Sequence, residues 1–149
     1  MLRKRTQARE CALQILYQYE MNPEPMPAIL EKFWSQQEET FSEDARSFAE
    51  KLALGVIENQ TEIDKVLARY ADNWELSRMA MIDRNVMRLA TYELLYLADV
   101  PPKVTLNEAV NLAKKFSQEE SGKFVNGILD KINHTEKPKN PKDHDPSAA

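Results

Sequence analysis

A chain of 149 residues with 42% hydrophobic and 30% charged residues has the size and composition of one globular domain with a buried core. Its formal net charge of −4 argues against a protein coated in nucleic acid, although a local basic site remains compatible with that charge. Glycine serves the turns that sheet proteins need, so a count of only three favours helices.

The single cysteine and the absence of long apolar runs predict a cytoplasmic protein. Cys11 cannot form an internal disulfide, which fits a reducing compartment. No apolar run approaches the roughly 20 residues that a membrane span needs. Polar residues follow the basic start Arg3–Arg5, where a signal peptide would have an apolar stretch.

The first half of the chain predicts three helices. Residues 4–20 carry apolar side chains on one helical face, and Pro23 and Pro25 end that pattern. A weaker pattern predicts a short helix over residues 28–37. A capping box at Thr40–Glu43 opens a long apolar pattern, which we expect to continue as one helix to about Tyr70.

The second half predicts further helices and a tail. Residues 74–81 indicate a short helix or turn, and Asp83 is expected to N-cap the next helix. After a break at Pro101 and Pro102, two more capping boxes begin helices that we expect to end near Phe116 and Ile132: Thr105–Glu108 and Ser117–Glu120. The whole pattern predicts an all-α domain over residues 1–132 and a disordered tail over residues 133–149.

A basic cluster at the start of the first helix is the clearest candidate site. Arg3, Lys4, Arg5 and Arg9 precede or adjoin the first acidic residue, Glu10. Each cation can meet an RNA phosphate, and an arginine can also stack on an unpaired base. The alternative is a solvated, frayed terminus, which is common in cytosolic proteins.

A second candidate site lies near the start of the last predicted helix. Phe124 can stack on an unpaired base while the neighbouring Lys123 contacts the backbone. The alternative has equal weight, because Phe124 also leads the apolar set of that helix and can belong to the core.

A dense polar set follows Asp83, and two interpretations of it stay open. Arg88, Tyr92 and Glu93 can form a partner surface or an internal brace between two helical bundles, and we favour the brace. No phosphate loop, Cys-x-x-Cys pair, Ser/His/Asp set or dinucleotide fingerprint is present, so the sequence predicts a non-catalytic binding protein without cofactor or metal.

Four motifs in fixed order resemble the NusB family of bacterial transcription antitermination factors. They are the opening Ala8–Ala12 with Leu16–Gln18, the run Asp83–Leu95, Val100–Pro101 followed by Asn107–Ala109, and Phe124–Gly127. The resemblance covers roughly residues 3–132, although residues 21–47 match little beyond helical character.

The resemblance implies an all-helical fold of two packed three-helix bundles. It further implies binding of the boxA element of nascent RNA, together with ribosomal protein NusE, inside a complex that holds RNA polymerase against termination. Dimers are known in the family, so a homodimer is also possible.

The resemblance also implies roles for individual residues. It places an arginine-rich RNA-binding motif at the basic N-terminus, although Thr6 and Gln7 depart from the richest family pattern. It places RNA contacts near Lys123 and Phe124, with Asn126 either bonded to backbone or facing RNA. Three residues are expected on the NusE-facing side, Tyr17, Glu75 and Asp83, and Gly127 is expected to pack closely against a neighbouring helix.

Two other functions remain open from the sequence. One is the NusB-like RNA-binding domain that precedes the methyltransferase domain of certain RNA cytosine methyltransferases, of which this chain would be a fragment. The other is a helical scaffold that dimerises and sequesters its own RNA site.

Overall fold

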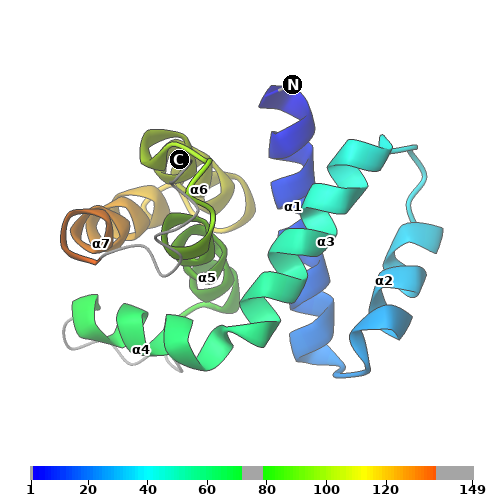
Figure 1. The fold of residues 1–149 in the computed structure, drawn as a ribbon, viewed down its shortest axis with the longest axis horizontal. Coiled ribbons are helices and arrows are strands. Elements are labelled where there is room, and N and C mark those ends of the chain that lie inside the picture. The colour runs from blue at the N-terminus through cyan, green and yellow to red at the C-terminus, as the bar shows by residue number, and fades with distance from the viewer. Residues whose placement is uncertain (1, 72–78, 137–149) are drawn as a thin grey trace, which may run out of the picture. The chain divides into compact units, whose positions relative to one another are not determined.

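The computed structural model describes residues 2–71 and 79–136, of which the side chains of residues 2 and 3 are not described. These residues form seven helices and no strand, so the all-α prediction is confirmed (Figure 1). The helices are α1 (Leu2–Met21), α2 (Met26–Ser35), α3 (Glu43–Glu58), α4 (Gln60–Tyr70), α5 (Met81–Tyr96), α6 (Pro102–Phe116) and α7 (Ser121–Thr135).

The chain divides into two compact units, Met1–Glu58 and Asn59–Ala149. The first unit contains α1, α2 and α3, and the second contains α4, α5, α6 and α7. The expected pair of packed three-helix bundles stays a prediction.

In the first unit, α1 packs against both α2 and α3. Small side chains on α1 let the helices approach closely, since Ala8 and Ala12 are fully buried. On α2, Trp34 donates its indole N–H to a carboxylate oxygen of Glu50 on α3 at 2.7 Å. A buried stripe on α1 and this hydrogen bond together hold the three helices as one unit.

In the second unit, α5 is the central helix and packs against α4, α6 and α7. Ten of its residues are buried, and polar residues are among them. A helix that is covered on several sides needs internal partners for its polar groups, because burying them unpaired is costly. This explains why α5 carries the dense polar set that the sequence revealed.

The prediction of one continuous helix from Glu43 to Tyr70 is wrong. The helix is interrupted at Asn59, which has φ −115° and ψ 18°. Asparagine competes with the helical backbone for hydrogen bonds and has a low helix propensity. The interruption falls at the boundary between the two units, so apolar residues before and after it serve different cores.

The first capping box was placed two residues too early. Ser42, and not Thr40, accepts the backbone N–H of Ala45 through its hydroxyl, at 3.1 Å. Glu43 and Asp44 then occupy the first turn of α3, where negative charge complements the helix dipole.

The other predicted caps are also wrong. Asp83 lies inside the first turn of α5, whose N-cap is Ala80. Pro101 is the N-cap of α6, so that helix begins before Thr105. Ser117 is the C-cap of α6 and does not begin α7. In each case the polar side chain is used for a contact between helices, as described below for Asp83 and Thr105.

Helix α7 ends at Thr135, a few residues beyond the predicted end. Glu136 follows it and accepts hydrogen bonds from Arg69 at 2.7 Å and from the Tyr70 hydroxyl at 2.6 Å. The hydrogen bond to Glu136 is the largest cause of a raised pKa of Tyr70. Residues 133–135 of the predicted tail therefore belong to α7, and the rest of that tail from residue 137 lies outside the described residues. Of the short helix or turn predicted over residues 74–81, residues 74–78 also lie outside them.

Within the described part of the chain, no helix combines the length and the apolar character that crossing a membrane requires.

Candidate nucleic-acid interface

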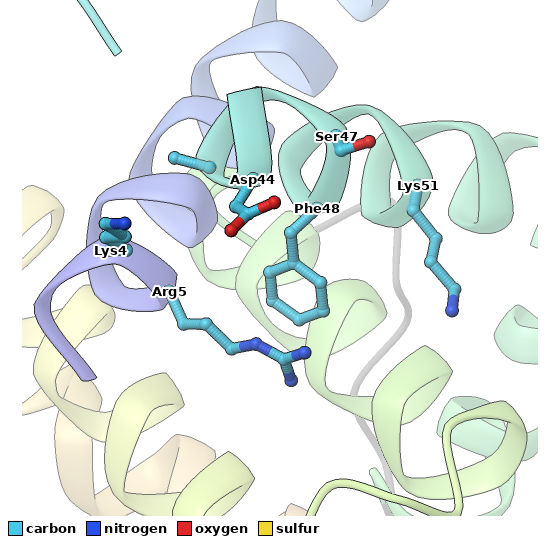
Figure 2. A pocket seen from close by; sticks show the side chains of 7 residues that line it. Lys4, Arg5, Asp44, Ser47, Phe48 and Lys51 are labelled. Carbon is cyan, nitrogen blue, oxygen red and sulfur yellow. The ribbon is translucent and has the colours of Figure 1, made fainter. Parts of the chain in front are cut away.

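A groove between α1 and α3 lies beside the basic N-terminus (Figure 2). Its volume is about 420 Å³. Two cations of the predicted basic cluster, Lys4 and Arg5, line the groove from α1. The other lining residues come from α3 and were not predicted as part of this site: Asp44, Ala45, Ser47, Phe48 and Lys51.

The lining of this groove is positively charged, although the whole chain has a formal net charge of −4. Lys4, Arg5 and Lys51 oppose a single carboxylate, that of Asp44, and all three cations are exposed. A concave surface with excess positive charge attracts polyanions even when the rest of the protein repels them. The groove can therefore hold a phosphate-bearing ligand.

The Arg5 guanidinium lies over the ring of Phe48, with 4.1 Å between its central carbon and the ring centroid (Figure 2). The guanidinium of Arg9 lies 5.4 Å from the same centroid. A cation over an aromatic face is held by the ring quadrupole, and arginine remains free to use its planar edge for hydrogen bonds.

The four predicted N-terminal cations differ in exposure. Lys4 and Arg5 are exposed in the groove, whereas Arg9 is only 2% exposed. The described structure therefore brings Lys4 and Arg5 together at the surface and leaves Arg9 beneath it. The structure does not describe the side chain of Arg3.

A second groove, of about 310 Å³, lies between the start of α5 and the start of α7 in the other unit. It brings together Asp83 and Phe124, which were predicted for the NusE-facing side and for RNA respectively. Gln118 and Glu120 also line it. Phe124 is half-buried, so its ring is available only in part, which leaves both the stacking and the core interpretation open.

Asp83 joins α5 to α7 at this groove. One carboxylate oxygen accepts the Ser121 hydroxyl at 3.1 Å, and the other is buried without a hydrogen-bond partner among the described residues. A buried acceptor without a partner is unfavourable, so this oxygen lowers the stability of the contact between α5 and α7.

The remaining predicted residues of α7 lie at its surface. Lys123 and Asn126 are exposed. Gly127 is exposed as well, and a Cβ at this position would meet nothing within 4 Å. The predicted close packing of Gly127 is therefore wrong. Gly122 has that environment instead, because its Cβ would lie 3.2 Å from a methyl group of Val110 on α6.

Arg88 connects α5 to α4 inside the second unit. Its guanidinium donates to both carboxylate oxygens of Asp64, at 2.8 and 2.9 Å, and also to the side-chain oxygen of Asn85 at 3.1 Å. Two parallel N–H···O bonds to a carboxylate give a strong and directional ion pair. This geometry supports the brace interpretation, although the brace joins helices of one unit.

Glu93 and Tyr92 continue the internal contacts of α5. Glu93 is 2% exposed and accepts the hydroxyl of Thr105 on α6 at 2.8 Å. The ring of Tyr92 stacks on that of Tyr96, with centroids 5.3 Å apart. These contacts favour a structural role for both residues over a partner surface.

The residues expected to face NusE are only partly described. Tyr17 on α1 is 48% exposed, which is unusual for a large aromatic side chain and leaves it available to a partner. Glu75 lies outside the described residues.

Sequence reasoning missed the α3 side of the first groove. Phe48 was assigned to the core because it belongs to an apolar helical pattern, and it is indeed only 8% exposed. Lys51 carried no signal, since an exposed lysine on an amphipathic helix is ordinary. Their proximity to Arg5 depends on the packing of α1 against α3, which no local pattern reveals.

Cys11 does not contribute a reactive group. Burial of the thiol, followed by the nearby charges of Glu10 and Glu39, raises its pKa to about 11. A thiol with this pKa is almost entirely protonated at neutral pH and is a poor nucleophile. The described residues also contain no cluster of three or more His, Cys, Asp or Glu side chains that could hold a metal ion.

Comparison with known proteins gives a consistent family. The sequence model of the NusB family matches residues 6–134. The transcription antitermination protein NusB of Thermodesulfovibrio yellowstonii is 46% identical over 137 residues, which covers 87% of this chain and 91% of that protein. The NusB of Myxococcus xanthus is 48% identical over 130 residues, which covers 86% of this chain and 93% of that protein.

Solved structures are similar over most of the chain. T. maritima NusB has a TM-score of 0.81 and 41% identity, covering 93% of this chain and 96% of that chain. A structure of antitermination factors NusB and NusE in complex with dsRNA also has a TM-score of 0.81, with 29% identity over 90% of this chain and 98% of that chain.

Proposed function

Because the chain belongs to the NusB family, we propose that it is a transcription antitermination factor that binds boxA RNA together with NusE. The relatives named above are transcription antitermination proteins, and one similar structure contains NusB and NusE with RNA. These relatives support the function class and RNA as the class of ligand.

The observation that supports RNA binding by this chain is the charge of the α1–α3 groove. Three exposed cations line it against one carboxylate, in a chain that is acidic as a whole. Cations in a groove attract phosphates while the acidic remainder of the surface repels them, so a nucleic acid is directed to one place. Arg3, Lys4 and Arg5 would contact phosphates of the bound strand, and Lys123, Phe124 and Asn126 would contact RNA at the second site.

NusE would bind at a different set of residues. Tyr17 offers an exposed aromatic ring, and tyrosine is a frequent anchor in protein interfaces. Asp83 lines the second groove, where its carboxylate contributes negative charge for a basic group of the partner. Glu75 completes the proposed set. The assembly would then act as part of the RNA polymerase antitermination complex, in the cytoplasm.

We propose a binding function without catalysis. The high coverage of both this chain and its antitermination relatives favours that function over the RNA-binding domain of an RNA cytosine methyltransferase. A homodimer stays a prediction, which sedimentation at micromolar concentration would test.

The decisive experiment is RNA binding with and without NusE. If both partners bind the same folded state of this chain, NusE should tighten boxA RNA binding, and RNA should tighten NusE binding by the same factor. Fluorescence anisotropy of a labelled boxA RNA measures the first affinity, and calorimetry measures the second. Equal affinities in the presence and absence of the other ligand would contradict the joint function.

A further inference from the structure

We infer that α3 forms the second wall of the RNA site, with Phe48 positioning Arg5 and Lys51 binding a phosphate of a single-stranded RNA. This inference rests on the proposed RNA-binding function and extends it to residues outside the basic N-terminus. It follows from the contents of the α1–α3 groove, where residues more than forty positions apart in the chain lie together.

The Phe48 ring restrains the side chain of Arg5. That side chain is exposed, and an exposed arginine loses much rotamer freedom when it binds. Here the centre of the guanidinium lies 4.1 Å from the centroid of the Phe48 ring, which restrains it beside α3 (Figure 2). A cation–π contact uses none of the N–H donors of the guanidinium, so they remain available to a ligand in the groove. A guanidinium that is already oriented loses less entropy when it grips a phosphate.

Lys51 and Ser47 can bind a phosphate from the α3 side of the groove. They are four residues apart on α3 and therefore share one face of the helix, which borders the groove. Lys51 supplies a mobile point charge, and the Ser47 hydroxyl can donate to a phosphate oxygen. Neither Lys4 nor Lys51 makes an ion pair with another described residue, so their charges are not neutralised within the described structure.

The size of the groove favours a single RNA strand over a duplex. Its volume of about 420 Å³ is near the lower end of the roughly 300–1,000 Å³ of pockets that enclose a small ligand. One nucleotide of a single strand fits such a volume, whereas a base pair would bring a second backbone with it. Asp44 also lines the groove and would repel a phosphate near its carboxylate, which limits the path of the strand.

The test uses the full chain and a short single-stranded boxA RNA, with NusE present. Lys51→Gln should weaken binding by about threefold to fivefold, as expected for one exposed ionic contact. It should also lower the slope of log affinity against log salt by about 0.7, the contribution of one phosphate on a single strand. The matched control is Lys32→Gln, which removes the same charge from α2 in the same unit and should change neither quantity.

A double-mutant cycle tests the role of Phe48. Phe48→Leu keeps an apolar side chain but removes the aromatic face, and it should weaken RNA binding only while Arg5 is present. The variant that also carries Arg5→Gln should therefore bind no more weakly than Arg5→Gln alone. A merely structural role of Phe48 would give additive losses. Thermal melting without RNA identifies variants that do not fold, and the Lys51 comparison remains decisive if Phe48→Leu is among them.

The outcomes separate the inference from the proposed function. If the unsubstituted chain does not bind boxA RNA, the proposed function is overturned and the inference with it. If that chain binds but Lys51→Gln behaves like Lys32→Gln, only the inference is overturned. If Lys51→Gln weakens the binding of duplex RNA and not of single-stranded RNA, the assignment of a single-stranded ligand to the groove is overturned.

Discussion

At the scale of single residues, the two arginines at positions 5 and 9 show how much burial changes the use of a side chain. They are one helical turn apart on α1 and both approach the Phe48 ring. Arg5 is exposed in the groove, whereas Arg9 is 2% exposed. A motif of basic residues therefore does not imply that all of them meet the ligand.

The two arginines should respond differently to the same substitution. We expect Arg5→Gln to weaken boxA RNA binding while leaving the melting temperature nearly unchanged. Arg9→Gln should lower the free energy of unfolding by about 1–3 kcal/mol, because glutamine cannot replace the contacts of a buried guanidinium, among them the one with the Phe48 ring. Anisotropy and thermal denaturation of both variants check this. Equal loss of stability in the two variants would contradict it.

Arg88 is the clearest case in which one residue braces two elements. Its side chain is 10% exposed and pairs with Asp64, which is 26% exposed. Arg88→Leu leaves a partly buried carboxylate unpaired, so we expect the free energy of unfolding to fall by about 2–4 kcal/mol. Urea denaturation measures that change. The control is Lys32→Leu, which removes an ion pair with Glu24 whose two side chains are 48% and 31% exposed, and it should have little effect.

At the scale of elements, two residues that the sequence predicts as helix caps, Asp83 and Thr105, instead join helices. Ser121 and Asp83 link α7 to α5, and Thr105 and Glu93 link α6 to α5. A serine or threonine followed by a glutamate satisfies the local pattern of a cap. The same side chains can bond a neighbouring helix, and the local pattern does not distinguish the two uses.

The two glycines of α7 provide a paired test at this scale. Gly127→Ala should stabilise the protein by about 1 kcal/mol, because alanine has the higher helix propensity and its Cβ meets nothing. Gly122→Ala should give less stabilisation or a loss, since its Cβ would lie 2.9 Å from the Lys114 side chain and 3.2 Å from that of Val110. Denaturant unfolding ranks the variants, and the reverse order would contradict the assignment of close packing to Gly122.

At the scale of the whole molecule, the contrast between a net charge of −4 and a positive groove should appear in the salt dependence of binding. If about four phosphates are contacted on a single strand, log affinity should fall with log salt at a slope near −3. A salt series of anisotropy titrations measures this slope. A slope close to zero would show that phosphate contacts do not carry the binding, and a much steeper one would require more phosphate contacts than Arg3, Lys4, Arg5 and Lys51 provide.

Which features the sequence predicts depends on how far apart in the chain the interacting residues lie. Apolar periodicity and helix-breaking residues act within a few positions, so the sequence predicted the all-α class and most helices. The family motifs likewise occur in order along the chain. Each of these features is local or linear and needs no knowledge of which helices touch.

Packing decided the rest. The interruption at Asn59 separates two cores. Only the packed structure shows that the apolar residues before Asn59 belong to the first unit and those after it to the second. The burial of Arg9, the open space around Gly127 and the contact of Arg5 with Phe48 all depend on which helix lies opposite. By itself, the sequence determined the helices and the family. Only the tertiary structure decided which cations reach a groove, because contacts between distant residues are created when helices pack and have no local signature.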